Sequence, residues 1–181
     1  MPIPLPPRRR PLLRALVRAP WTARARTSPA VRRWCDEHGS ITPHFTWRSY
    51  ACSDGTPVPV PLRPNAIRLH WRLELLRHRL GDVPMTVDGP YRTAARNRAV
   101  GGAADSRHVH ADGADFYRAQ VDDWARHLRR KDESLADARD RVMALADRTF
   151  SDGGVGNETS GTLHLDARGT RARFVTWVAG R

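Results

Sequence analysis

The feature that most constrains this fold is a stripe of apolar side chains between residues 62 and 80. They recur at steps of four and three along the chain: Leu62, Ala66, Leu69, Leu73, Leu76 and Leu80. That spacing is typical of one face of an α-helix, and Gly81 is a stop signal. The sequence therefore predicts an amphipathic helix over 62–80, whose apolar face needs a second layer to pack against. His70 and His78 flank the stripe, and we expect both at the surface or its boundary.

Shorter patterns predict the elements around this helix. Short strands are expected over residues 83–87, 114–118, 163–167 and 174–178, the last two as alternating antiparallel strands. The glycine-rich run 153–156 reads as a turn-rich loop. Further helices are expected over 93–100 and over 119–147, with a break near Lys131–Asp132. This order predicts an α+β fold in which helices pack on a small, mainly antiparallel sheet.

The first 33 residues differ in composition from the rest of the chain. They contain nine arginines and no acidic residue, so the net charge of +12 leaves only +3 for residues 34–181. Prolines recur throughout this stretch and disfavour a long helix. We expect a basic, flexible leader over 1–33 and one folded domain over 34–181. Such a leader can attract any polyanion, whether nucleic acid, anionic lipid or an acidic wall polymer.

Cysteines and apolar runs give weaker constraints. Cys35 and Cys52 show no Cys-x-x-Cys spacing, which argues against a thiolate zinc site and leaves open whether they pair or stay free. No apolar run reaches the roughly 18 to 20 residues of a membrane span. Arg14 and Arg18 interrupt the apolar stretch near the start, so a cleavable export signal is not favoured.

Three residues form a candidate metal-binding set. His108 and Asp115 lie seven residues apart around small residues, and His164 lies on the strand expected over 163–167. Zinc binds imidazole nitrogen and carboxylate oxygen, and a catalytic site keeps one position open for water. Small residues between His108 and Asp115 allow the connection to turn tightly, so that the two can converge. Taken alone, a histidine such as His108 is more often a hydrogen-bonded surface residue, and Asp115 could simply cap a turn or pair with an arginine.

The order of four motifs over residues 45–178 resembles the zinc D-alanyl-D-alanine carboxypeptidase family of bacterial and phage wall peptidases. The segment Phe45–Pro59 is similar to the first conserved stretch of that family. The other similar motifs are Asp88-Gly89-Pro90-Tyr91-Arg92-Thr93 with Asn97 and Gly101-Gly102, Ser106-x-His108 with Asp115, and Gly153–Gly156 with His164-x-Asp166-x-Arg168 and Trp177. The resemblance implies the Hedgehog/DD-peptidase-like fold.

The resemblance also implies a role for each residue of these motifs. His108, Asp115 and His164 would bind Zn²⁺. Arg92 would hold the terminal carboxylate of the substrate or stabilise a developing oxyanion, tasks that suit a permanently charged, bidentate side chain. Ser106 would orient the substrate or cap a local turn.

The chain departs from the family pattern near the final histidine. Several branches of the family carry an acidic general base three residues before that histidine, where this chain has Gly161. Asp166 shares a strand face with His164 and is our first candidate for the base, with an orienting role as its alternative. Glu158 is the second candidate. Ala111 replaces a customary glycine, which is tolerable if its backbone angle φ is negative, and His110 is expected in solvent.

These observations predict a monomeric zinc-dependent peptidase that hydrolyses peptidoglycan stem peptides, as a D,D-carboxypeptidase or an endopeptidase. The alternative is a non-catalytic zinc-binding module of the same fold that binds the cell wall. A nucleic-acid-binding role has little support, because no reader motif or aromatic stacking platform is present. We expect action at the cell wall, outside the membrane, for a host enzyme, and residence in the cytoplasm before lysis for a phage-derived one.

Overall fold

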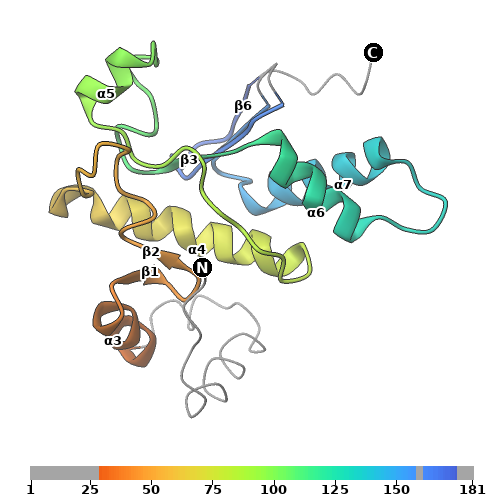
Figure 1. Ribbon diagram of the computed structural model, residues 1–181, viewed down its shortest axis with the longest axis horizontal. Helices are drawn as coiled ribbons and strands as arrows, with labels where there is room; N and C mark the ends of the chain where they lie inside the picture. The colour runs from red at the N-terminus through yellow and green to blue at the C-terminus, as the bar shows by residue number, and fades with distance from the viewer. Residues whose placement is uncertain (1–28, 158–160, 175–181) are drawn as a thin grey trace.

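The computed structural model describes residues 29–157 and 161–174 (Figure 1). Five α-helices, one 3-10 turn and six strands follow one another along these residues. In chain order they are α3 (Pro29–Glu37), β1 (Ser40–Thr42), β2 (Phe45–Thr46), η2 (Val60–Leu62), α4 (Arg63–Arg79), α5 (Ala94–Ala99), β3 (Gly113–Phe116), α6 (Arg118–Leu128), α7 (Leu135–Thr149), β4 (Gly154–Asn157), β5 (Leu163–Asp166) and β6 (Ala172–Phe174). The mixture confirms the α+β class.

Strands β3 to β6 form a four-stranded sheet in the order β3-β5-β4-β6. The pairs β3–β5 and β5–β4 are antiparallel, whereas β4–β6 is parallel. Two expectations were therefore wrong. The glycine-rich run contains strand β4, because its main chain pairs with β5 along its length. The last strand begins at Ala172 and lies parallel to its neighbour, because it returns to the far side of β4. Residues 175–178 of that expected strand lie outside the described residues.

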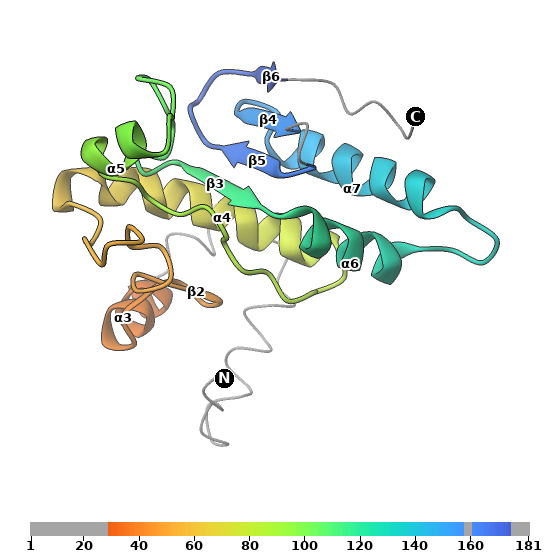
Figure 2. The same ribbon diagram turned by 45° about the horizontal axis from the view of Figure 1, so that its top comes forward.

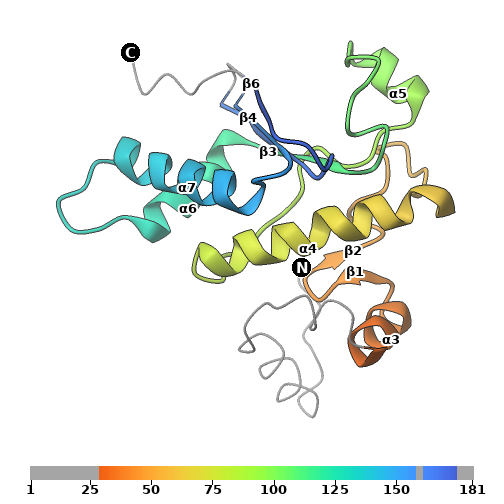
Figure 3. The same cartoon turned by 180° about the vertical axis from the view of Figure 1, so that it is seen from behind.

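Helix α4 is the centre of the molecule. It runs between the four-stranded sheet on one side and the β1–β2 hairpin with α3 on the other (Figures 1 and 3). Its bounds confirm the helix predicted from the leucine stripe, and Leu69, Leu73 and Leu76 are fully buried. Helices α6 and α7 lie side by side at one end of the sheet (Figure 2). They confirm the predicted break, since α6 ends at Leu128 and α7 begins at Leu135.

His70 is a correction to the sequence analysis. It was expected at the surface or its boundary, yet its side chain is fully buried among the core residues of α4. Its Nδ1 lies 2.8 Å from the carbonyl oxygen of Ala66, and its ring packs edge-on against Phe45 and Tyr50. The apolar stripe of α4 is therefore wider than the leucines indicate, because the hairpin covers a second face of the helix.

The segment before α5 is extended but is not the strand expected over 83–87. Gly89 makes an isolated antiparallel bridge with Asp115, so this part of the chain runs beside β3. Upstream, the carbonyl oxygen of Pro84 accepts a hydrogen bond from the Trp124 indole, and the main-chain N–H of Thr86 bonds the Gln120 side chain. Contacts with α6 replace strand pairing there, since Pro84 has no N–H to donate.

Helix α5 confirms the short helix expected over 93–100. Thr93 caps it by accepting a hydrogen bond from the main-chain N–H of Arg96. Helix α3 spans the boundary expected between residues 33 and 34, while residues 1–28 of the expected leader lie outside the described residues. Cys35 and Cys52 are both buried and are not bonded to each other. No described helix is long and apolar enough to cross a membrane.

Burial of His70 generates a pH prediction for stability. Burial lowers the pKa of His70 from 6.5 to about 4. As the pH drops below 6.5, His70 takes up a proton in the unfolded chain but stays neutral in the folded chain. The free energy of unfolding therefore falls as the pH drops from 6.5 towards 4. We expect a loss of about 1 to 2 kcal/mol in the free energy of unfolding between pH 6.5 and pH 5.

Urea denaturation across this range, with a chelator present, measures the effect. His70→Phe keeps an aromatic ring against Phe45 and Tyr50 but removes the titrating group. The variant should therefore lose this slope. Equal slopes in the variant and the native chain would contradict the assignment.

Candidate metal centre

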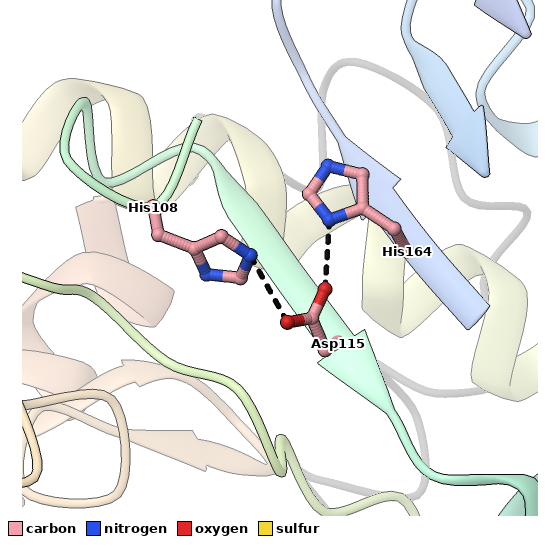
Figure 4. A group of neighbouring side chains, drawn as sticks. All are labelled: His108, Asp115 and His164. Atoms are coloured by element: carbon pink, nitrogen blue, oxygen red, sulfur yellow. Dashed lines mark hydrogen bonds and ion pairs between the residues drawn. The ribbon is translucent and has the colours of Figure 1, made fainter. Parts of the chain in front are cut away.

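Three side chains from separate segments converge at one point: His108, Asp115 and His164 (Figure 4). Each offers one ligand atom, and these atoms lie within 4.8 Å of one another. His108 Nε2 is 3.1 Å from one oxygen of Asp115, and His164 Nδ1 is 2.7 Å from the other. This is the set that the sequence predicted, and the fold brings all three together.

The sheet positions two of the three side chains. Asp115 on β3 lies directly opposite His164 on β5 in the antiparallel register. Side chains alternate along a strand, so the neighbours Phe116, Leu163 and Leu165 point to the other face, where all three are buried in the core. One face of the sheet thus holds the protein together while the other presents the two ligands side by side.

A tight turn positions His108. The carbonyl oxygen of His108 accepts from the N–H of Ala111, and that of Arg107 accepts from the N–H of Asp112. Ala111 has a φ of 55°, so the condition of a negative angle is not met. The turn needs a left-handed residue at this point, a conformation that costs alanine roughly 1 to 2 kcal/mol and explains the glycine customary there.

Asp112 supports this turn and was missed by the sequence analysis. Its side chain is fully buried, and its carboxylate accepts hydrogen bonds from Nε and from a terminal nitrogen of the Arg107 guanidinium. Arg68 of α4 approaches the same carboxylate at 3.4 Å and also bonds the carbonyl oxygen of Ala167. Through these contacts, Arg68 and Asp112 hold the His108 turn against α4 and the end of β5. No spacing in the sequence distinguishes Asp112 from the other aspartates.

The outer nitrogen of each histidine is also bonded. His108 Nδ1 lies 2.9 Å from the carbonyl oxygen of Pro90, and His164 Nε2 lies 3.2 Å from a carboxylate oxygen of Asp166. Both partners only accept hydrogen bonds, so His108 keeps Nε2 and His164 keeps Nδ1 for the centre. Two oriented imidazoles, one carboxylate and fixed outer nitrogens are the donor set that zinc prefers. The residues therefore fit a zinc ion.

The pKa values of Asp115 and His164 are shifted because these groups lie close together. Burial raises the pKa of the Asp115 carboxyl, but hydrogen bonds from His108 and His164 outweigh burial and hold it well below its usual range. Burial lowers the pKa of His164, whereas Asp115 and Asp166 raise it, to about 9 in the metal-free protein. A cation at this point would replace the proton of His164 as the partner of Asp115.

With this geometry established, comparisons with known proteins identify the family. A model of the family described as Peptidase M15 matches residues 43–137 of the chain. This chain belongs to the Peptidase M15 family. The matched residues include His108 and Asp115 and end before His164.

A curated relative of this Peptidase M15 chain is the zinc D-Ala-D-Ala carboxypeptidase of Streptomyces albus G. The two are 41% identical over 64 residues, which is 35% of this chain and 25% of the relative. The chain thus matches about a quarter of the length of that relative.

Arg92 reaches the candidate metal centre of this Peptidase M15 chain. One of its terminal nitrogens lies 3.0 Å from Asp115 Oδ2, and its side chain is 26% exposed. Its main-chain N–H bonds the carbonyl oxygen of His108. Ser106 lies in the turn before His108, where its carbonyl oxygen accepts from the N–H of Val109. Arg92 thus contacts Asp115 of the candidate metal centre, whereas the main-chain hydrogen bonds of Ser106 are those of a turn.

The two candidate bases differ in what the structure says of them. Asp166 is fully buried, and both of its oxygens accept hydrogen bonds. Burial raises its pKa, but His164 and Arg168 hold that pKa well below the usual range. These contacts favour the orienting role over the base. Glu158 lies outside the described residues. His110 is exposed, as expected.

Close packing around Asp115 gives a test of the geometry. A Cβ added at Gly89 would lie 2.6 Å from Asp115 Cβ. We expect Gly89→Ala to displace the Asp115 carboxylate and weaken zinc binding about 10-fold, measured by competition with a chromophoric chelator.

Gly55→Ala is the matched control for losing a glycine. Gly55 has a φ of 86° with no atom within 4 Å of an added Cβ, so this variant should lose stability but keep the zinc affinity. Equal zinc affinity in all three proteins would contradict the placement of Asp115.

Proposed function

We propose that this chain is a zinc-dependent peptidase that hydrolyses the peptide stems of peptidoglycan, as a D,D-carboxypeptidase or an endopeptidase. The observation that carries the proposal is the convergence of His108, Asp115 and His164 within 4.8 Å in a member of the Peptidase M15 family. The name of the Streptomyces relative supports the metal and the type of substrate. The proposal places the enzyme at the cell wall, with peptidoglycan as its partner and the chain as a monomer.

In this proposal His108, Asp115 and His164 hold the zinc ion. When bound, zinc supplies a Lewis acid that polarises a carbonyl group and lowers the pKa of water. The sheet and the His108 turn keep the three ligands in place before substrate arrives, so little reorganisation is needed. The centre lies on the face of the sheet opposite to the core residues Phe116, Leu163 and Leu165.

Arg92 is the anion-binding residue of the proposal. Its guanidinium lies 3.0 Å from Asp115 and so borders the metal centre. A planar, permanently charged group at this point can bind the terminal carboxylate of a stem peptide or an oxygen that becomes negative during hydrolysis. Ser106 lies in the adjacent turn and is assigned to orienting the same end of the substrate.

A general base must accept a proton from water and deliver it to the leaving amine. Both oxygens of Asp166 are engaged by Arg168 and neighbouring groups, which leaves Glu158 as the stronger of the two carboxylates named from the sequence. Glu158→Gln should then lower kcat about 100-fold or more while zinc stays bound.

A second candidate function is a zinc-binding module that binds the wall without cutting it. Gly161, where several branches of the family carry the acidic base, favours it. Gly161 has a φ of 82°, and an added Cβ would lie 2.7 Å from the Arg118 side chain, so this position does not accept an acidic residue without rearrangement.

Hydrolysis of stem peptides tests the proposal. Purified full chain with zinc should release D-alanine or a cleaved stem, detected by mass spectrometry, and a chelator should stop the reaction. Arg92→Ala should lower kcat/KM about 100- to 1,000-fold, and Arg92→Lys should restore part of it because the charge remains. Zinc binding without hydrolysis would favour the module instead.

A further inference from the structure

Asp166 is held more firmly than a general base requires. Its Oδ1 accepts three hydrogen bonds, from the main-chain N–H of Gly154 at 3.0 Å, that of Arg168 at 3.1 Å and the Arg168 Nε at 2.8 Å. Its Oδ2 accepts from an Arg168 terminal nitrogen at 2.6 Å and faces His164 Nε2 at 3.2 Å. The carboxylate is fully buried, so no lone pair is left facing solvent.

We propose that Asp166 is a positioning residue that fixes the ring of His164 so that Nδ1 faces the metal centre. Arg168 and Gly154 hold the carboxylate for this task. This inference rests on the proposed zinc function. In it, His164 binds the metal through Nδ1, because Asp166 holds the other ring nitrogen.

The selection follows from what a carboxylate can do. An ionised carboxylate only accepts hydrogen bonds, so the nitrogen of His164 that faces it carries the proton. The other nitrogen, Nδ1, then points at Asp115, and a cation that displaces the Nδ1 proton can bind its lone pair. Asp166 and His164 are two residues apart on β5 and share one face of the sheet, so the contact is built into the strand.

The two histidines present different ring nitrogens to the centre, because each is held through the opposite nitrogen. His108 donates a hydrogen bond from Nδ1–H to the carbonyl oxygen of Pro90 and keeps Nε2 for the centre. His164 is paired the other way round, and its partner is a full negative charge rather than a carbonyl dipole. A carboxylate partner makes the imidazole a more basic ligand and fixes its ring more firmly.

Two features keep Asp166 in place. The Arg168 guanidinium binds both oxygens as a fork, which fixes the plane of the carboxylate. Gly154 lies against the carboxylate on β4, and a Cβ there would overlap the Asp166 side chain. Gly154, which the sequence places in a loop, therefore leaves room for the buried carboxylate of Asp166.

Asp166→Asn tests the proposal with little change in shape. Its amide oxygen can keep the bonds of Oδ1, but its NH2 group takes the place of Oδ2 and loses the hydrogen bond from the Arg168 terminal nitrogen. The same NH2 group then faces His164 Nε2 and favours the tautomer that places the proton on Nδ1. We expect zinc affinity to fall about 10- to 100-fold, measured by chelator competition. In zinc-loaded protein, the slowly exchanging Nε2–H proton of His164 in the NMR spectrum should be lost or shift upfield.

Two further variants separate positioning from general damage. Asp147→Asn removes a carboxylate from another aspartate–arginine pair, with Arg173, and should leave zinc affinity within twofold of the native chain. Asp166→Ala removes the acceptor without presenting a donor to His164, so it should bind zinc no more weakly than Asp166→Asn. A purely structural role predicts the reverse order, because alanine leaves the larger cavity.

The outcomes distinguish this inference from the proposed function. If the native chain binds no zinc, the proposed function fails. If the native chain binds zinc and Asp166→Asn binds it within twofold with an unchanged His164 proton signal, the positioning role is overturned. If Asp166→Asn does not fold, Arg168→Gln provides the same test, with an expected loss of affinity between those of the control and Asp166→Asn.

Discussion

The pairing of Asp115 with His164 across two antiparallel strands is the constraint on which the rest of the site depends. The register places these residues directly opposite each other, on the face of the sheet that does not pack on the core. A slip of one residue would turn both side chains towards the buried face and bring Phe116 or Leu165 out of it. The hydrophobic core therefore fixes the position of the ligands as strongly as it fixes the fold.

Charge burial is the cost of this arrangement. Asp112 and Asp166 are fully buried next to the centre, and each is paired with arginine: Asp112 with Arg107 and Arg68, Asp166 with Arg168. Breaking one partner of such a pair leaves an uncompensated buried charge, which costs roughly 3 to 5 kcal/mol. The arginines beside the centre thus have a structural task, which limits how many of them are available to bind an anionic substrate.

The sequence predicted the α+β class, helix α4 and the three side chains that converge at the candidate metal centre, because leucine spacing and the motif order can be read along the chain. It missed what depends on tertiary contacts. The sequence predicts a loop where strand β4 lies, because glycines are typical of turns. Only the fold shows that Gly154 lies against the Asp166 side chain, where a Cβ would not fit. His70 was placed at the boundary because the hairpin that covers it is distant in the chain. The positive φ of Ala111 and the clamp of Asp112 follow from the shape of one turn, which no spacing encodes.

X-ray absorption at the zinc edge, on the purified full chain, tests whether His108, Asp115 and His164 hold a zinc ion. We expect about one zinc per chain, bound by nitrogen and oxygen at about 2.0 to 2.2 Å, with the multiple-scattering pattern of two imidazole rings. Loss of one ring from that pattern in His164→Ala would tie the signal to this centre. A sulfur shell at about 2.3 Å, which would come from Cys35 or Cys52, would contradict this zinc site. A protein that binds no zinc would contradict it as well.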